Sequence, residues 1–229
     1  MPASFAFRRL PGLCSICHGW CRGPLCGECL ERFAAPRARC RRCAIDVPVG
    51  QSVCGACLRE PPPFERAVAA VGYEHPWSGL IARFKFHGGV ELAALFAGLM
   101  REALHDEPPP DLLLPAPLSP QRLRERGYNQ SWEIARRLHP GADARLLLRI
   151  RDTPHQVDLP LERRAANVRD AFAVEPLRRR ELEGRSVVLF DDVLTTGATA
   201  CEMTRVLLAA GAARVQVWML ARTPRPQDR

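Results

Sequence analysis

Two adjacent carboxylates, three threonine hydroxyls and a glycine lie within a short stretch near the C-terminal end of the chain. They belong to Asp191, Asp192, Thr195, Thr196, Gly197 and Thr199. Hydroxyl groups, together with backbone N–H groups that a glycine leaves accessible, can bind a phosphate. Carboxylates repel a phosphate but accept hydrogen bonds from the vicinal hydroxyls of a ribose. The stretch therefore predicts a site for a ribose 5-phosphate, and the alternative is an ordinary capped helix after a polar turn.

The flanking residues predict the elements that would position these groups. The apolar run Val187 to Phe190, β-branched at its start, indicates a buried strand of a parallel sheet. Residues 198–210 are expected to form a helix that Gly211 caps, and 215–220 a second strand. The apolar positions of this helix are Ala200, Met203, Leu207 and Leu208. Its first turn would add unpaired N–H groups and a positive dipole end to the phosphate site.

This pattern resembles the signature of the type I phosphoribosyltransferases, whose substrate is phosphoribosyl pyrophosphate. The resemblance implies an α/β fold with a parallel sheet flanked by helices, and it makes Asp191 and Asp192 the catalytic pair that holds the ribose hydroxyls. The substrate-binding loop would consist of Asp191, Asp192, Val193, Leu194, Thr195, Thr196, Gly197, Ala198 and Thr199. Neither a Walker A loop nor a G-x-G-x-x-G fingerprint occurs in the chain, which disfavours the rival nucleotide-binding folds.

Eight cysteines near the N-terminus form four C-x-x-C pairs, a spacing that suits zinc bound by thiolates. The pairs are Cys14 and Cys17, Cys26 and Cys29, Cys40 and Cys43, and Cys54 and Cys57. Sequential pairing predicts one site from the first four cysteines and a second from the last four, and interleaved pairing stays open. A disulfide framework is the weaker alternative, because residues 1–13 lack the apolar stretch of a secretory signal.

The partner of this cysteine-rich segment stays open. A double zinc ribbon can contact nucleic acid, dock a protein or serve as a structural cap. The formal charge of +8 falls to about +4 if each of two four-thiolate zinc sites carries a net −2. The arginines around the third pair are Arg37, Arg39, Arg41 and Arg42. They favour an anionic partner, or they offset the negative charge of the metal site.

Three consecutive prolines at 61–63 indicate a domain boundary. We expect a double zinc ribbon over 1–60, a proline linker over 61–65 and a phosphoribosyltransferase-like domain over 66–229. In that domain we expect a strand at 67–73, helices at 80–86 and 91–104, and a short strand at 112–114. No apolar run is long enough for a membrane span, so a soluble, cytoplasmic protein is predicted.

Several residues outside the loop are candidate contacts of a pyrophosphate, or of a lid that closes over it. The pyrophosphate candidates are Lys85, which is the only lysine of the chain, Pro115 at a strand end, and Arg122 and Arg126 before a helix that ends at Leu138. The lid candidates are Gln156, Arg163 and Asn167. The alternative is that these side chains cover a solvated helix face or pack beside aromatic rings.

Taken together, four patterns are similar to the ComF family of competence proteins over nearly the whole chain. They are the C-x-x-C pairs, Pro115-Ala116-Pro117, the motif from Arg126 to Gln130, and the Asp-Asp loop. The resemblance implies a double zinc ribbon, a phosphoribosyltransferase-type domain and, in several bacteria, the handling of single-stranded DNA during natural transformation. It also implies competence helicase or recombination proteins as partners. Tyr128 occupies a position where the family more usually has phenylalanine.

Three functional hypotheses follow from the sequence. The first is a phosphoribosyltransferase that uses Mg²⁺ and transfers to a nitrogenous base that the sequence does not specify. The second is a non-enzymatic nucleotide-pool sensor that binds phosphoribosyl pyrophosphate without turnover. The third is a zinc-ribbon nucleic-acid binder whose other domain is mainly scaffold, and it predicts salt-dependent binding to single strands that survives Asp191→Asn.

Overall fold

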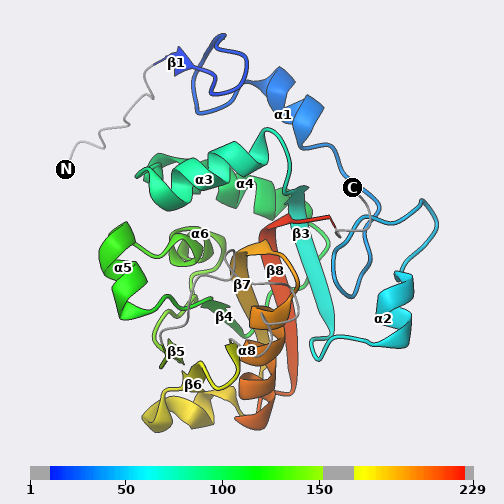
Figure 1. Ribbon diagram of the computed structural model, residues 1–229, viewed down its shortest axis with the longest axis vertical. Helices are drawn as coiled ribbons and strands as arrows, with labels where there is room; N and C mark the ends of the chain where they lie inside the picture. The colour runs from blue at the N-terminus through cyan, green and yellow to red at the C-terminus, as the bar shows by residue number, and fades with distance from the viewer. Residues whose placement is uncertain (1–10, 152–167, 225–229) are drawn as a thin grey trace, which may run out of the picture. The chain divides into compact units, whose positions relative to one another are not determined.

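The computed structural model describes residues 11–151 and 168–224, and its central element is a four-stranded parallel sheet (Figure 1). The strand order is β3-β8-β7-β4, and all three neighbouring pairs are parallel. The strands are β3 (Arg66–Gly72), β8 (Arg214–Arg222), β7 (Ser186–Leu194) and β4 (Leu112–Pro115). This sheet confirms the predicted fold class.

Helices cover the two central strands. Helix α8 (Ala198–Ala209) packs on β7 and β8, and shares a core with their residues Val187 and Val217. The alternate residues of β7, Val188 and Phe190, are buried as well, so both faces of this strand are covered, as its continuous apolar run predicts. Helix α4 (Ala93–Ala103) contacts β3 and β8, and helix α6 (Gln130–Leu138) contacts β4 and β7.

Several elements differ from the predicted ones in their bounds. Strand β7 continues through both aspartates to Leu194, because Asp191 and Val193 still pair with residues of the long strand β8. The helix predicted at 91–104 is a 3-10 turn, η1 (Val90–Leu92), followed by α4, and the helix predicted at 80–86 begins earlier, as α3 (Trp77–Phe86). Leu208, predicted on the apolar stripe of α8, is 37% exposed.

Four short elements after residue 115 were not predicted. They are α5 (Pro120–Arg126), the antiparallel pair β5 (Leu147–Arg149) and β6 (Phe172–Val174), and the 3-10 helix η3 (Pro176–Leu182). The start of α5 has a clear local signal, since Ser119 accepts a hydrogen bond from the backbone of Arg122 and Pro120 occupies the first helical position.

By compactness the chain divides into two units, between Ala35 and Pro36. The smaller unit contains the antiparallel pair β1 (Gly12–Leu13) and β2 (Trp20–Cys21), and helix α1 (Gly27–Phe33). The larger unit contains helix α2 (Gly55–Arg59) and the sheet. The division expected at 61–65 stays a prediction, and in this structure Phe64 is buried in the core of the sheet. Among the described residues, no helix has both the length and the hydropathy needed to cross a bilayer.

Candidate functional site

The acid and threonine residues lie where β7 ends and α8 begins, at the carboxyl edge of the parallel sheet. This is the edge at which open α/β sheets bind ligands. The turn from Thr195 to Gly197 joins the two elements, and Gly197 has a φ of 85°, in the left-handed region that glycine adopts at low cost. The Thr196 hydroxyl accepts a hydrogen bond from the backbone N–H of Ala198 at 3.3 Å. The structure therefore places a helix start beside the two carboxylates, as the sequence predicts.

Asp192 is a buried carboxylate, 3% exposed, that lies beside the only lysine of the chain. Its Oδ1 is 2.9 Å from Nζ of Lys85, the last but one residue of α3. Its Oδ2 is buried and has no hydrogen-bond partner within the described part of the chain. A buried acceptor without a donor is costly unless a ligand supplies one, so this oxygen suits a ligand hydroxyl.

Asp191 is half-buried, and its Oδ1 accepts a hydrogen bond from the backbone N–H of Asp192 at 2.9 Å. Burial, followed by the negative charge of Asp192, raises the pKa of Asp191 to about 7. The positive charge of Lys85 and the hydrogen bond from the Asp192 N–H act in the opposite direction. Near neutral pH this carboxyl is therefore close to its midpoint, and a cationic or hydrogen-bonding ligand would favour its ionised form.

The motif from Arg126 to Gln130 holds the neighbouring elements together around this site. Asn129 caps α6, because its Oδ1 accepts a hydrogen bond from the Trp132 N–H at 3.1 Å. Its Nδ2 donates to the carbonyl of Ala116, directly after β4, at 3.0 Å. The Tyr128 hydroxyl donates to the carbonyl of Phe84 in α3. The motif thus connects the end of β4 with the helix that carries Lys85.

The pyrophosphate candidates fall into two groups. Lys85 and Arg126 line one hollow of about 230 Å³ with Phe86, Gly88 and Glu125, and the Arg126 guanidinium lies 5.0 Å from the centre of the Phe86 ring. Pro115 is buried at the end of β4, opposite Phe190 of β7, and Arg122 is half-buried in α5. The lid candidates Gln156, Arg163 and Asn167 lie outside the described residues.

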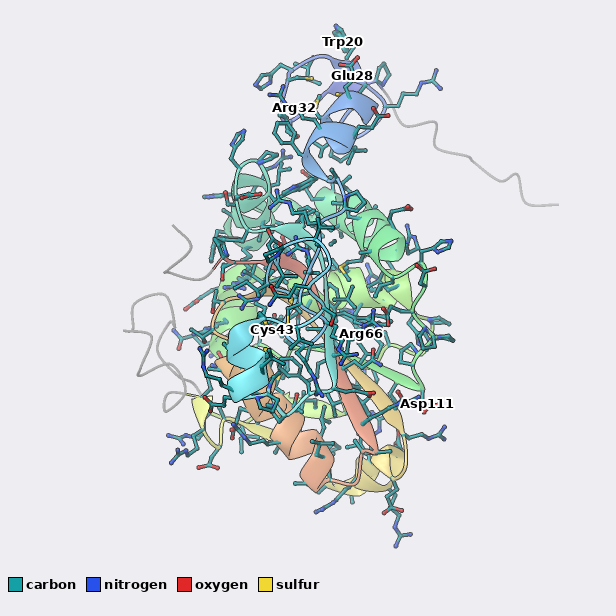
Figure 2. All side chains as sticks on the ribbon, turned by 90° about the vertical axis from the view of Figure 1, so that its right-hand side faces the viewer. Trp20, Glu28, Arg32, Cys43, Arg66 and Asp111 are labelled. Carbon is teal, nitrogen blue, oxygen red and sulfur yellow. The ribbon has the colours of Figure 1, made fainter. Side chains whose placement is uncertain are left out.

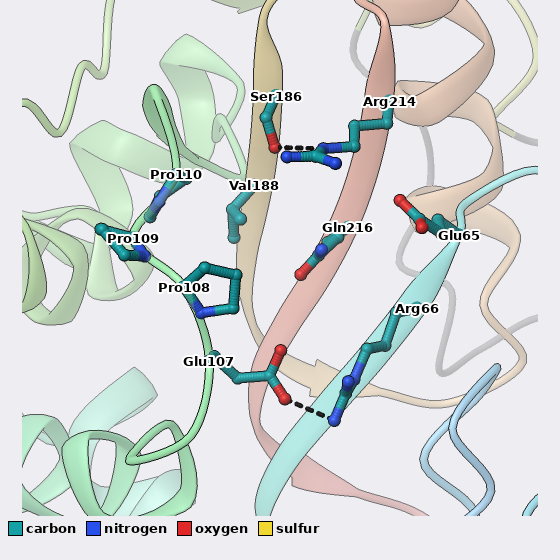
Figure 3. A pocket seen from close by; sticks show the side chains of 10 residues that line it. All are labelled: Glu65, Arg66, Glu107, Pro108, Pro109, Pro110, Ser186, Val188, Arg214 and Gln216. Carbon is teal, nitrogen blue, oxygen red and sulfur yellow. Dashed lines mark hydrogen bonds and ion pairs between the residues drawn. The ribbon is translucent and has the colours of Figure 1, made fainter.

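A second hollow, of about 240 Å³, lies at the opposite edge of the sheet (Figure 3). It is lined by residues at or near the starts of the strands, such as Arg66, Ser186 and Arg214. Glu107 forms an ion pair with Arg66, and Ser186 accepts a hydrogen bond from Arg214 at 2.9 Å. Because the lining arginines already have partners and the hollow is at the amino edge, we do not assign the sugar-phosphate site to it.

The cysteines form two tetrads, and in each the four Sγ atoms lie within 4.8 Å of one another. The tetrads are Cys14, Cys17, Cys26 and Cys29, and Cys40, Cys43, Cys54 and Cys57. The pairing is thus sequential, and the interleaved alternative is wrong. The Sγ–Sγ distances of 3.6 Å between Cys17 and Cys26 and 3.7 Å between Cys43 and Cys54 match the edge of about 3.8 Å of a tetrahedral zinc–thiolate site. Both tetrads could therefore hold zinc.

The two tetrads repeat one backbone design. In the first, the Cys26 N–H donates to Cys14 Sγ at 3.4 Å, and in the second the Cys54 N–H donates to Cys40 Sγ at 3.3 Å. Backbone hydrogen bonds outweigh burial and lower the pKa of Cys14 and of Cys54 to about 6, whereas burial raises the pKa of Cys29, Cys43 and Cys57. Low thiol pKa values favour the thiolates that bind a metal. The first tetrad belongs to the smaller unit, on which Figure 2 labels Trp20, Glu28 and Arg32.

One residue near the site could not be identified from the sequence. Arg222, the last residue of β8, is 7% exposed, and its guanidinium donates hydrogen bonds to the carbonyls of Leu194 and Thr195 at 2.9 and 2.6 Å. Its signal in the sequence is weak, since a single arginine after an apolar run is also typical of an exposed strand end.

Comparisons with known proteins agree with this geometry. Residues 150–229 match the model of the phosphoribosyl transferase domain. The chain is 36% identical to DNA utilization protein YhgH of Escherichia coli (strain K12), over 93% of this chain and 98% of the relative. It is 30% identical to competence protein F of Haemophilus influenzae (91% and 96% of the two chains) and 28% identical to competence protein ComFC of Bacillus subtilis (87% and 77%).

Proposed function

Because the chain belongs to the ComF family, we propose that it binds phosphoribosyl pyrophosphate at the carboxyl edge of its sheet and acts in the use of DNA. Asp191 and Asp192 would hold the ribose hydroxyls, and the loop through Thr199 would hold the 5-phosphate. Lys85 and Arg126, which line one hollow, would meet the pyrophosphate, with Pro115 and Arg122 on the neighbouring elements. Gln156, Arg163 and Asn167 stay proposed lid contacts.

The observation that carries this proposal is the buried carboxylate of Asp192 beside the start of α8. One of its oxygens is paired with Lys85, whereas the other has no donor among the described residues. A ribose hydroxyl would supply that donor, and the 5-phosphate of the same sugar would then meet the turn from Thr195 to Gly197. A phosphate alone would not explain two adjacent acids at this place.

The residues present also fit the two metals that the family implies. Each cysteine tetrad has the donor set and spacing of a structural zinc site. The two aspartates offer the oxygen ligands that Mg²⁺ prefers. When bound with the substrate, Mg²⁺ would neutralise charge on the pyrophosphate and the acids.

If the protein is an enzyme, a nitrogen nucleophile displaces pyrophosphate from C1 of the ribose. The C1–O bond to pyrophosphate breaks, a C1–N bond forms, and the pyrophosphate leaves with the bonding electrons. The protein would contribute positioning and charge neutralisation. Binding without turnover remains the second hypothesis, and pyrophosphate release in the presence of candidate bases distinguishes the two.

Calorimetry of the zinc-loaded full chain with phosphoribosyl pyrophosphate and Mg²⁺ tests the proposal. We expect binding by the wild type and a loss of at least about tenfold in affinity for Asp191→Asn with Asp192→Asn, since a charge-assisted hydrogen bond contributes about 1.5–3 kcal/mol. The matched control is Asp106→Asn, because the Asp106 side chain is 95% exposed and contacts the neighbouring surface residue His105. No heat from the wild type, or equal affinity for the double variant, would refute the assignment.

The DNA role rests on the relatives, and it includes single-stranded DNA and competence helicase or recombination proteins as proposed partners. A gel-shift assay with a single-stranded oligonucleotide at two salt concentrations tests direct contact. Binding that weakens with salt and is reduced in Arg41→Ser with Arg42→Ser would support contact through the second tetrad. Unchanged binding in this variant would place the contact elsewhere.

A further inference from the structure

A single buried guanidinium joins the second cysteine tetrad to the candidate phosphate loop. Nε of Arg222 donates a hydrogen bond to the carbonyl of Cys43 at 2.9 Å. Nη1 of the same side chain donates to the carbonyls of Leu194 and Thr195, and also to that of Thr223 at 2.8 Å. Cys43 and Arg222 are 179 residues apart in the chain, so only the fold brings these carbonyls together.

These hydrogen bonds fix the direction of the loop's own amides. In a trans peptide unit the C=O and the following N–H point in opposite directions. Because Arg222 draws the carbonyls of Leu194 and Thr195 toward itself, the N–H groups of Thr195 and Thr196 are directed away from it. The Leu194 carbonyl is held further by the backbone N–H of Thr223 at 3.1 Å. The guanidinium thus orients amides at the entrance to α8, where a phosphate would bind.

The other end of the link is part of a metal-binding loop. Cys43 Sγ lies within the second tetrad, so a bound metal would fix the position of this residue and of its carbonyl. The loop is anchored to the sheet as well, because Ala44 is fully buried in the same core as β7 and the Ala67 N–H donates to the Arg41 carbonyl at 3.0 Å. Figure 2 shows Cys43 on the larger unit, in the loop before α2.

We propose that Arg222 is a positioning residue that couples metal binding at the second tetrad to sugar-phosphate binding at the loop after β7. The proposal rests on the proposed function, and it goes beyond it by giving the second metal centre a part in ligand affinity. Coupling between two sites is reciprocal in affinity, so a bound sugar phosphate must also raise the affinity of this tetrad for its metal, and we expect it to do so by slowing metal release. The first tetrad serves as the comparison, because its four cysteines belong to the other compact unit.

The rate of zinc release measures this coupling without relying on activity. The zinc-loaded full chain is mixed with a colorimetric zinc chelator, with and without phosphoribosyl pyrophosphate and Mg²⁺. In the wild type we expect the ligand to slow release of one zinc equivalent about five- to tenfold, and to leave the other unchanged. Cys29→Ser, which removes the first tetrad, should retain the slowed equivalent.

The decisive variant is Arg222→Lys, because an ammonium keeps the charge but lacks the planar fork that presents Nε and Nη1 in two fixed directions. We expect it to bind two zinc ions and to lose most of the slowing. The matched control is Arg214→Lys, which changes the opposite end of the same strand and should behave as wild type. The coupling would be overturned if the ligand slowed zinc release from Arg222→Lys as much as from the wild type. It would also be overturned if the wild type bound the ligand in calorimetry but released zinc at an unchanged rate.

A second measurement separates failure of the coupling from failure of the proposed function. If the wild type shows no calorimetric binding, the proposed function fails, and hydrogen exchange of the ligand-free, zinc-loaded protein tests the link alone. Arg222→Lys should speed hydrogen exchange in peptides that cover residues 193–200 and 40–57. The exchange rate of peptides that begin in β4 should stay unchanged. If Arg222→Lys folds poorly, Arg222→Gln, which keeps one donor group, takes its place. The rate of zinc release from the second tetrad and the hydrogen exchange of these peptides are then compared between Arg222→Gln and the wild type. Unchanged exchange at 193–200 in a folded variant would refute the link.

Discussion

Replacing Asp191 by asparagine should make stability depend less on pH between about 4 and 7. Burial and the charge of Asp192 raise the pKa of Asp191 from 3.8 to about 7 in the folded protein. A raised carboxyl pKa gives stability that is fully present below the unfolded-state value and is lost as the pH rises through the folded-state value. The wild type should therefore lose free energy of unfolding from this carboxyl as the pH approaches neutrality, and the asparagine variant should not.

The size of this loss can be worked from the pKa. A rise from 3.8 to about 7 corresponds to about 4 kcal/mol at about 1.4 kcal/mol per pKa unit. About half of that falls above pH 5.5. Because Asp191 is only half-buried and water screens its charge, we expect about 1 to 2 kcal/mol between about pH 5.5 and about pH 8.

Urea unfolding of the zinc-loaded protein at several pH values measures this difference. Protonation of the cysteine clusters also changes stability with pH, but it affects wild type and variant alike and cancels in their difference. Glu181→Gln is the control, since Arg178 lowers the pKa of Glu181, so this carboxyl has no raised pKa that would cost stability as the pH approaches neutrality. If the wild-type and Asp191→Asn curves run parallel, the assigned pKa of Asp191 is wrong.

Three further changes test other parts of the structure. Tyr128→Phe removes the hydroxyl that donates to the Phe84 carbonyl, and should lower the free energy of unfolding by about 1 kcal/mol in urea; an unchanged midpoint would contradict this contact. Gly197→Ala places a side chain at a φ of 85°, which should cost about 1 to 2 kcal/mol and weaken phosphoribosyl pyrophosphate binding in calorimetry. If Gly197→Ala bound phosphoribosyl pyrophosphate with wild-type affinity, the turn would not need a left-handed backbone at this position to bind its ligand. Cys29→Ser and Cys57→Ser should each lose about one zinc ion by mass spectrometry. Only Cys57→Ser should lower the urea midpoint of the larger unit, and equal midpoints would argue against a structural role for the second tetrad.

The central unit from β7 to β8 could be predicted because its signals are local. A continuous apolar run, a helical repeat of apolar residues and a glycine at the helix end are all visible within about 35 residues. Gly211 has a φ of 111°, and the N–H of Ala212 donates to the Leu207 carbonyl at 3.1 Å, which is the expected glycine cap. The four closely spaced cysteine pairs were predictable as metal ligands for the same reason, whereas their division into two tetrads stayed open until the structure brought the pairs together.

The contacts that complete the site could not be predicted, because they join distant segments. Lys85 was predicted as an anion ligand, and in the structure its nearest charge is the Asp192 carboxylate, which the sequence places more than 100 residues away. Arg222 is a stronger case, since it donates hydrogen bonds to carbonyls in the second tetrad, at the end of β7 and at the neighbouring Thr223. Periodicity describes which face of an element is buried, and it carries no information about which distant carbonyl lies there.

The charges of the larger unit help to weigh the functional hypotheses against one another. Two of the four arginines near the third cysteine pair already have acidic partners, since Arg37 pairs with Asp46 and Glu74, and Arg39 lies 2.9 Å from Asp46. A nucleic acid would have to compete with these carboxylates, so basic composition alone is a weak argument for DNA contact at the second tetrad. At the carboxyl edge the balance is reversed, because two adjacent acids share one lysine and one buried oxygen has no donor among the described residues. That unmet requirement for hydroxyl donors is why the chemical role is better placed at the sheet edge, whereas the DNA role rests on membership of the family.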